Sequence, residues 1–135
     1  MIPLLLAWEA GCWLYEKTER RRLFREARVC CQRSRKPMLV VGEPDGEYPC
    51  PPPGGALVDL RPTSVCPNHV RASIEFLPMF RDKQFGAAFV SHVIEHVEHP
   101  LRALAELTRV ADRVLISYPR PWRLAPYLVP GHPWL

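Results

Sequence analysis

The sequence of 135 residues lacks the paired cysteines that hold small secreted domains together. Its five cysteines are an odd number, no two of them form a C-x-x-C pair, and Cys30 and Cys31 are adjacent. This pattern argues against a disulfide framework and a zinc ribbon, and it favours a reducing, cytoplasmic compartment. The sequence also contains no P-loop, Ser-His-Asp pattern, zinc knuckle or internal repeat, so it gives no support to the classes that those motifs mark.

The chain has no apolar run with the features of a secretory or membrane-spanning segment. Residues 2–15 are apolar except for Glu9, but no positive charge precedes them and no A-x-A site follows, so a signal peptide is not indicated. A helix of about fourteen residues is ~21 Å long, against ~30 Å of bilayer hydrocarbon. Trp8, Trp13 and the basic run Arg20-Arg21-Arg22 predict an anchor at a membrane surface or a helix packed against another protein subunit.

Basic residues are concentrated at one end of the chain. Residues 1–37 contain nine Lys or Arg and four Glu, whereas residues 38–135 contain nine basic and ten acidic residues. The second part is therefore nearly neutral. Nucleic-acid binding, which needs a basic surface, is not expected of it.

Proline positions and hydrophobic patterns divide the chain into three parts. Residues 1–36 predict a helical arm, because no glycine or proline interrupts residues 12–36. Residues 37–122 predict an α/β domain, and residues 123–135 form a proline-rich tail. The domain has material for five strands, at about 38–41, 56–60, 74–77, 87–91 and 113–118.

The segment Phe85–Trp122 predicts a strand, a polar turn, a helix and a second buried strand. Pro100 suits the first position of the helix. A strand–helix–strand unit of this length is parallel, and open parallel sheets bind ligands at the carboxyl edge of their strands. The helix is expected to bury one apolar stripe and to turn Arg102, Glu106 and Arg109 toward water. The predicted stripe consists of Leu101, Leu104, Ala105, Leu107 and Thr108.

The turn Ser91–Val97, with the sequence SHVIEHV, resembles the "SHVLEHV" signature of a branch of the class I S-adenosylmethionine-dependent methyltransferases. Ile74–Pro78 resembles that family's "AEhLPF" stretch. Met38–Gly42 is similar to its first strand and first motif glycine, and Leu57–Leu60 to its second strand. The resemblance covers roughly residues 36–122. It implies a reduced Rossmann-like α/β fold, preceded by a long N-terminal helix, and S-adenosylmethionine as the cofactor.

The resemblance also implies a set of site residues. It places Gly42, Gly46, Asp59 and Ser91 at the cofactor, with Asp59 on the ribose. It places His92, Glu95 and His96 at the mouth of the pocket as candidate catalytic residues. Two structural alternatives remain open: Asp59 caps the turn that follows it, and the residues of the SHVIEHV turn bond the turn and cap the next helix.

Residues 92–96 also match H-x-x-E-H, an inverted zinc-protease pattern. That chemistry requires both histidines on one helix, one turn apart. Here the pattern straddles a strand end and a turn, so no metal is expected.

Several positions depart from the family pattern. Pro44 stands at the middle motif glycine, and Ser73 stands where the family often has an aspartate that contacts the adenine. Only eight residues, four of them proline, separate Gly46 from Gly55. A crossover helix needs about a dozen residues. Material for the family's last two strands is missing, so the strand at 113–118 should expose a sheet edge or be covered by the tail or a partner.

The features that match the family and those that depart from it are consistent with two functions of different class. The sequence favours a degenerate methyltransferase-like subunit that is a structural or anchoring part of a larger assembly. Its partners would be another protein, further copies of the chain, or a membrane surface, reached through residues 2–15 and the exposed sheet edge. The alternative is an active S-adenosylmethionine-dependent methyltransferase.

Overall fold

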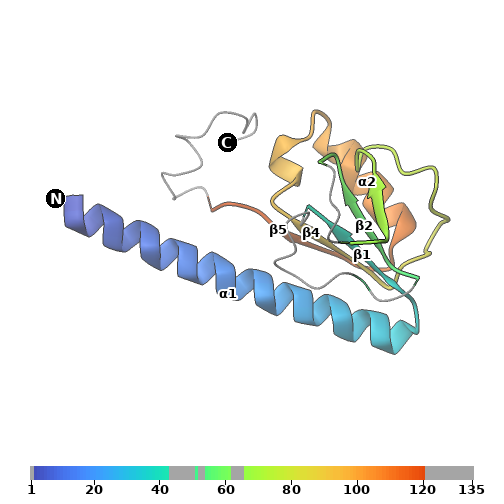
Figure 1. Ribbon diagram of the computed structural model, residues 1–135, viewed down its shortest axis with the longest axis horizontal. Coiled ribbons are helices and arrows are strands. Elements are labelled where there is room, and N and C mark those ends of the chain that lie inside the picture. Colours follow the sequence, from blue (N-terminus) through green and yellow to red (C-terminus); the bar gives the residue numbers. More distant parts are fainter. Residues whose placement is uncertain (1, 43–50, 52–53, 62–65, 121–135) are drawn as a thin grey trace.

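In a computed structural model, the chain forms one five-stranded sheet with a long helix on one face and a short helix on the other (Figure 1). The structure describes residues 2–42, 51, 54–61 and 66–120. All strands are parallel, in the order β3-β2-β1-β4-β5. This is the predicted reduced Rossmann-like α/β fold. Its elements are α1 (Ile2–Ser34), β1 (Met38–Val41), β2 (Ala56–Asp59), β3 (His69–Arg71), β4 (Ala87–Ser91), the 3-10 turn η1 (Ile94–His96), α2 (Pro100–Val110) and β5 (Val114–Ser117).

The central strands are apolar because both of their faces are covered. Val40 of β1 is paired with Leu57 of β2 on one side and with Phe89 of β4 on the other. All three side chains are buried, as expected for parallel strands between helical layers. The chain runs outward from β1 in one direction through β2 and β3, and then in the other direction through β4 and β5. The switch point of the sheet therefore lies between β1 and β4.

The second half of α1 packs against the sheet. Phe24 and Ala27 are buried, and the Phe24 ring meets the Phe89 ring edge to face at 5.3 Å. α1 contacts β1, β4 and β5 on the face opposite α2.

The first half of α1 projects beyond the sheet (Figure 1). The single long helix expected for the arm is confirmed. Most of the large apolar side chains of this half are exposed, namely Leu4, Leu5, Leu6, Trp8, Trp13, Leu14 and Tyr15. Within the part of the chain that the structure describes, no helix is both long enough and apolar enough to span a bilayer.

The third strand does not lie where the sequence placed it. The prediction of a strand at 74–77 is wrong, because β3 is His69–Arg71 and residues 74–77 form turns. The Ser73 carbonyl accepts the N–H of Phe76, and the Ser73 hydroxyl accepts the N–H of Glu75. Local bonds thus replace the ladder that a strand would need. Ile74 and Leu77 are nevertheless buried, which explains why their pattern imitated a strand.

The buried face of α2 is also different from the predicted stripe. Ala103, Leu107 and Val110 face the sheet, whereas Leu101 is 81% exposed. These three positions have the i, i+4, i+7 spacing of a helix face. Leu107 alone belongs to both the predicted stripe and the buried face. The buried face therefore lies on another side of the helix, and this difference changes the role of the polar positions.

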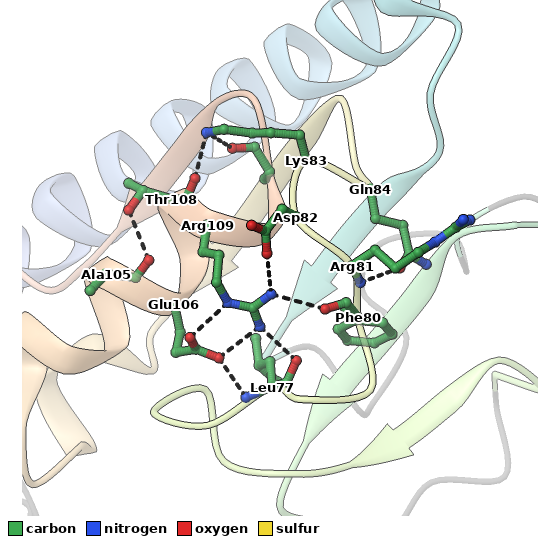
Figure 2. Close-up of polar contacts among 11 residues, drawn as sticks. Leu77, Phe80, Arg81, Asp82, Lys83, Gln84, Ala105, Glu106, Thr108 and Arg109 are labelled. Carbon is green, nitrogen blue, oxygen red and sulfur yellow. Dashed lines mark hydrogen bonds and ion pairs between the residues drawn. The ribbon is translucent and has the colours of Figure 1, made fainter.

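Two of those positions, Glu106 and Arg109, do not simply face water as predicted. The Arg109 guanidinium donates to the carbonyls of Leu77 and Phe80 at 2.9 and 3.0 Å, and to the carboxylates of Glu106 and Asp82 (Figure 2). Glu106 also accepts the Leu77 N–H at 2.8 Å. The two side chains therefore fix the loop between β3 and β4 against α2. We call them, with Asp82, the Arg109 cluster.

Lys83 completes this attachment at the carboxyl end of α2. Its ammonium donates to the carbonyls of Thr108 and Ala111, and its backbone N–H donates to the Arg109 carbonyl (Figure 2). A cation at the last turn suits the helix dipole and satisfies carbonyls that have no partner within the helix.

The strand at the end of the sheet is only half buried. In β5, Leu115 and Ser117 are buried, and Val114 and Ile116 are partly exposed. Among the described residues, β4 alone pairs with β5, so β5 is an outer strand of the sheet. The tail that the sequence offered as its cover lies outside the described residues.

Candidate functional site

A cavity of about 320 Å³ opens at the carboxyl edge of the sheet, beside the switch point. Its walls come from four places in the chain: the ends of β1 and β2, the loop after β3, and the turn after β4. The polar or conformationally special residues in these walls are Gly42, Asp59, Arg61, Ser73, His92 and His96. The position is the one where open parallel sheets bind ligands.

Gly42 lets the chain leave β1 close to β4. Its φ is +84°, and a Cβ on this residue would collide with the side chain of Val93 and the carbonyl oxygen of Ser91. Its N–H donates to the Val58 carbonyl at 3.1 Å. A left-handed backbone in such close contact requires glycine. The first expected cofactor residue therefore lies in the cavity wall, in a conformation that other residues would strain.

Asp59 lies at the end of β2 with its side chain 10% exposed. Its Oδ1 accepts the N–H of Arg61 at 2.7 Å, and the Arg61 Nε lies 3.7 Å from the same oxygen. The turn-capping alternative is thus confirmed. It does not use the whole carboxylate, because Oδ2 makes no hydrogen bond within the described part of the chain. One acceptor remains for a ligand hydroxyl.

The other two expected cofactor residues are less informative. Gly46 lies outside the described residues, as does Pro44. Ser91 is fully buried, and its backbone carbonyl is the group that lies against Gly42. Its hydroxyl makes no hydrogen bond to any described residue. The side chain of Ser91 therefore lies behind the cavity wall.

The three candidate catalytic residues fall into two environments. His92 and His96 line the cavity, whereas Glu95 is buried with its side chain 5% exposed. His92 has φ +49°, and its N–H donates to the Ser117 carbonyl at 2.9 Å. Its Nδ1 lies 3.4 Å from Oε1 of Glu95. The structure brings His92 and Glu95 together and places His96 on the same rim.

The helix-capping alternative for these residues is wrong. His99 is the N-cap of α2, and no side chain of the cap residue bonds there. The N–H groups of Glu98 and His99 instead donate to the Glu75 carboxylate at 2.9 and 3.1 Å. Sequence reasoning missed Glu75. The only signal was an acidic residue in the "AEhLPF"-like stretch, and nothing local connects it to a helix that starts 25 residues later.

The H-x-x-E-H pattern lies at the end of β4 and in η1, not on one α-helix. Across the described ranges, no group of three or more His, Cys, Asp or Glu side chains is placed to hold a metal ion.

Comparison with known families gives one match. Residues 56–113 match the model of a family described as a methyltransferase domain. The match runs from the start of β2 to the residue before β5, and it includes Asp59 and the SHVIEHV turn. Comparisons with curated proteins and with solved structures gave no match. The resemblance drawn from the sequence is confirmed over residues 56–113, which lie within the α/β domain.

Proposed function

We propose that the cavity binds S-adenosylmethionine and that the protein is a cofactor-binding, methyltransferase-like protein. One observation carries the proposal: Gly42 and Asp59 form two walls of one cavity at the switch point, together with the loop after β3. Small-molecule sites usually enclose about 300–1,000 Å³, and this cavity, at about 320 Å³, falls at the lower end. The sequence alone favoured a structural subunit that has lost cofactor binding. The retained cavity instead favours a protein that binds the cofactor.

The residues present fit the cofactor. Oδ2 of Asp59 would accept a hydrogen bond from a ribose hydroxyl, while Oδ1 keeps the turn closed through Arg61. Ala72 and Ile74 would give the adenine an apolar surface, with Ser73 between them. The absence of a side chain at Gly42 keeps the space that a Cβ would fill.

When bound, this cofactor supplies an electrophilic methyl group on a sulfonium. The chain would then contribute chiefly by holding an acceptor in line, because methyl transfer depends mostly on the placement of donor and acceptor. His92 and His96 lie on the rim where such an acceptor would enter.

Calorimetry with S-adenosylhomocysteine tests the proposal, with Asp59→Asn as the informative variant. Asparagine keeps an Oδ1 that caps the Arg61 turn, but it removes the second acceptor. We expect micromolar binding by the wild-type protein and a loss of tenfold or more in the variant, which corresponds to about 1.4 kcal/mol.

Glu98→Gln is the matched control, because the Glu98 side chain is 84% exposed and is not part of the cavity wall. It should bind like the wild type. If the folded wild-type protein does not bind at millimolar ligand, the cofactor proposal is wrong and a scaffold without cofactor is supported.

We propose as a second function that the first half of α1 attaches the domain to a larger protein assembly. Its exposed apolar side chains lie on a helix whose other half is fixed to the sheet. Leu4, Leu6 and Leu14 point in different directions around the helix, since 100° separates successive residues. Such a helix needs cover on several sides, which a protein partner or further copies of the chain provide.

The full-length variant Leu4→Gln/Leu6→Gln/Leu14→Gln tests this second function. We expect light scattering to show assembly of the wild-type protein and a smaller species for the variant. Leu101→Gln is the control, because Leu101 is an equally exposed leucine on α2. A wild-type monomer that binds neither protein nor anionic vesicles would contradict an attachment role, and binding to vesicles alone would identify lipid as the partner.

A further inference from the structure

Glu95 is a buried carboxylate without the hydrogen bonds that burial usually demands. Neither Oε1 nor Oε2 makes a hydrogen bond to any described residue, although the side chain is only 5% exposed. Burying an ionised carboxylate is costly unless a partner compensates for the lost hydration. The charged partner that the structure provides is the imidazole of His92, with its Nδ1 3.4 Å from Oε1.

His92 is held in an unusual conformation beside this carboxylate. Its φ of +49° lies in the left-handed region, which is strained for a non-glycine residue. The bond from its N–H to the Ser117 carbonyl fixes its backbone to β5. Its ring lines the cavity. Because Nδ1 is the nitrogen near Glu95, Nε2 is the nitrogen left for a ligand.

We propose that His92 and Glu95 form an imidazole–carboxylate pair that removes a proton from a ligand in the cavity. The ligand's O–H or N–H bond breaks, its electron pair stays on the ligand atom, and a new N–H bond forms at Nε2 of His92. The Nδ1–H is directed at Glu95, whose negative charge balances the imidazolium. This role rests on the proposed function, because the deprotonated ligand atom would be the methyl acceptor.

The geometry gives the two residues different roles. His92 reaches the cavity and is the catalytic residue of the pair. Glu95 lies behind it and is a positioning residue, which sets the tautomer and the ring orientation of His92. A separation of 3.4 Å is longer than a hydrogen bond, but such contacts are often long before a ligand binds and shorten afterwards.

Other charged or titratable groups line the cavity together with His92, namely Asp59, Arg61 and His96. The Arg61 Nε lies 3.7 Å from the Asp59 carboxylate, so the charges of these two residues partly offset each other. Glu95 is the carboxylate that lies within ion-pair distance of the ring.

The test is an NMR measurement of the tautomers of the histidine imidazoles in the full-length protein. In the wild type we expect the neutral ring of His92 to carry its proton on Nδ1. In Glu95→Gln, which removes the carboxylate, the ring should lose this preference and carry part of its proton on Nε2. Glu95→Asp should restore part of the Nδ1 preference.

The pair His99–Glu98 is the matched control. It has the same chemistry at 3.9 Å, but its side chains are 58% and 84% exposed. Glu98→Gln should therefore leave the tautomer of His99 unchanged, because solvent screens exposed pairs.

Two results would overturn the pair: a wild-type His92 with its proton on Nε2, or a tautomer of His92 that is the same in wild type and Glu95→Gln. The wild-type tautomer decides the matter even if the glutamine variant fails to fold. Binding of S-adenosylhomocysteine is measured on the same samples. Binding without the Nδ1 tautomer of His92 refutes this inference alone, and the Nδ1 tautomer without binding refutes the proposed function alone.

Discussion

Glu106→Gln should make the protein less stable at neutral pH and remove part of its sensitivity to acid. Glu106 accepts two bonds from the Arg109 guanidinium, at 2.9 and 3.0 Å, and one from the Leu77 N–H at 2.8 Å. These donors, above all Arg109, lower the pKa of Glu106 from 4.5 to about 2. Glutamine keeps the size and one acceptor oxygen but loses the charge.

The magnitude follows from this pKa shift. One pKa unit corresponds to about 1.4 kcal/mol of differential interaction, so the full shift would correspond to ~3 kcal/mol. The Glu106 side chain is 20% exposed and its partner Arg109 is 30% exposed, so solvent weakens the interaction. We therefore expect a loss of about 1 to 2 kcal/mol, or roughly 3 to 8 °C in Tm for a domain of this size.

The pH dependence has a definite sign. Because the pKa of Glu106 is lower in the folded state, its contribution is complete above about pH 4.5 and is lost as the pH falls toward 2. Urea unfolding followed by circular dichroism at pH 7, 4 and 3 measures it. The difference between wild type and Glu106→Gln should shrink at each lower pH. Glu98→Gln, at an exposed site, should show no such pattern. A constant difference across this range would refute the reasoning.

Two further variants test the fold that supports the cavity. Phe24→Ala should lower the free energy of unfolding by about 3 to 5 kcal/mol, because the Phe24 ring is buried against Phe89; a loss below 1 kcal/mol in urea unfolding would mean that α1 is not fixed to the sheet. Gly42→Ala should abolish S-adenosylhomocysteine binding in calorimetry and lower Tm, because its Cβ meets Val93 and Ser91 at positive φ; unchanged Tm and binding would mean that β1 and β4 do not approach as closely as described.

The sequence was most informative where neighbouring residues determine the structure. The apolar run before Ser91, the Pro100 helix start and the second apolar run gave β4, α2 and β5 because each depends on local propensity and short-range burial. The location of the cavity followed from the rule for parallel sheets. Predicting that location required only the positions of the strand ends, near Gly42, Asp59 and Ser91. The hydrophobic pattern predicts these strand ends to within a residue or two.

The predictions from the sequence were wrong where residues far apart in the chain determine the local structure. Residues 74–77 look like a strand by their apolar content, but bonds from Ser73 and from Glu106, 29 residues away from Leu77, fold them into turns. The Arg109 cluster joins residues from the loop and from α2, so no local pattern could separate these side chains from solvated ones. In the same way, the resemblance placed His92 and Glu95 at the mouth of the pocket, but it did not show that the carboxylate is buried beside the ring.

The packing of α1 on the late strands has a consequence for synthesis of the chain. α1 is synthesised before the sheet, and the residues that pack with Phe24 and Ala27 include Phe89 of β4 and Leu115 of β5. Ser34 and Ser117 are separated by about 80 residues, which a ribosome adds in roughly 4 to 16 s at 5–20 residues per second. During that interval the apolar face of the helix lacks part of the sheet on which it packs. The nascent chain should therefore be a chaperone client until β5 has emerged.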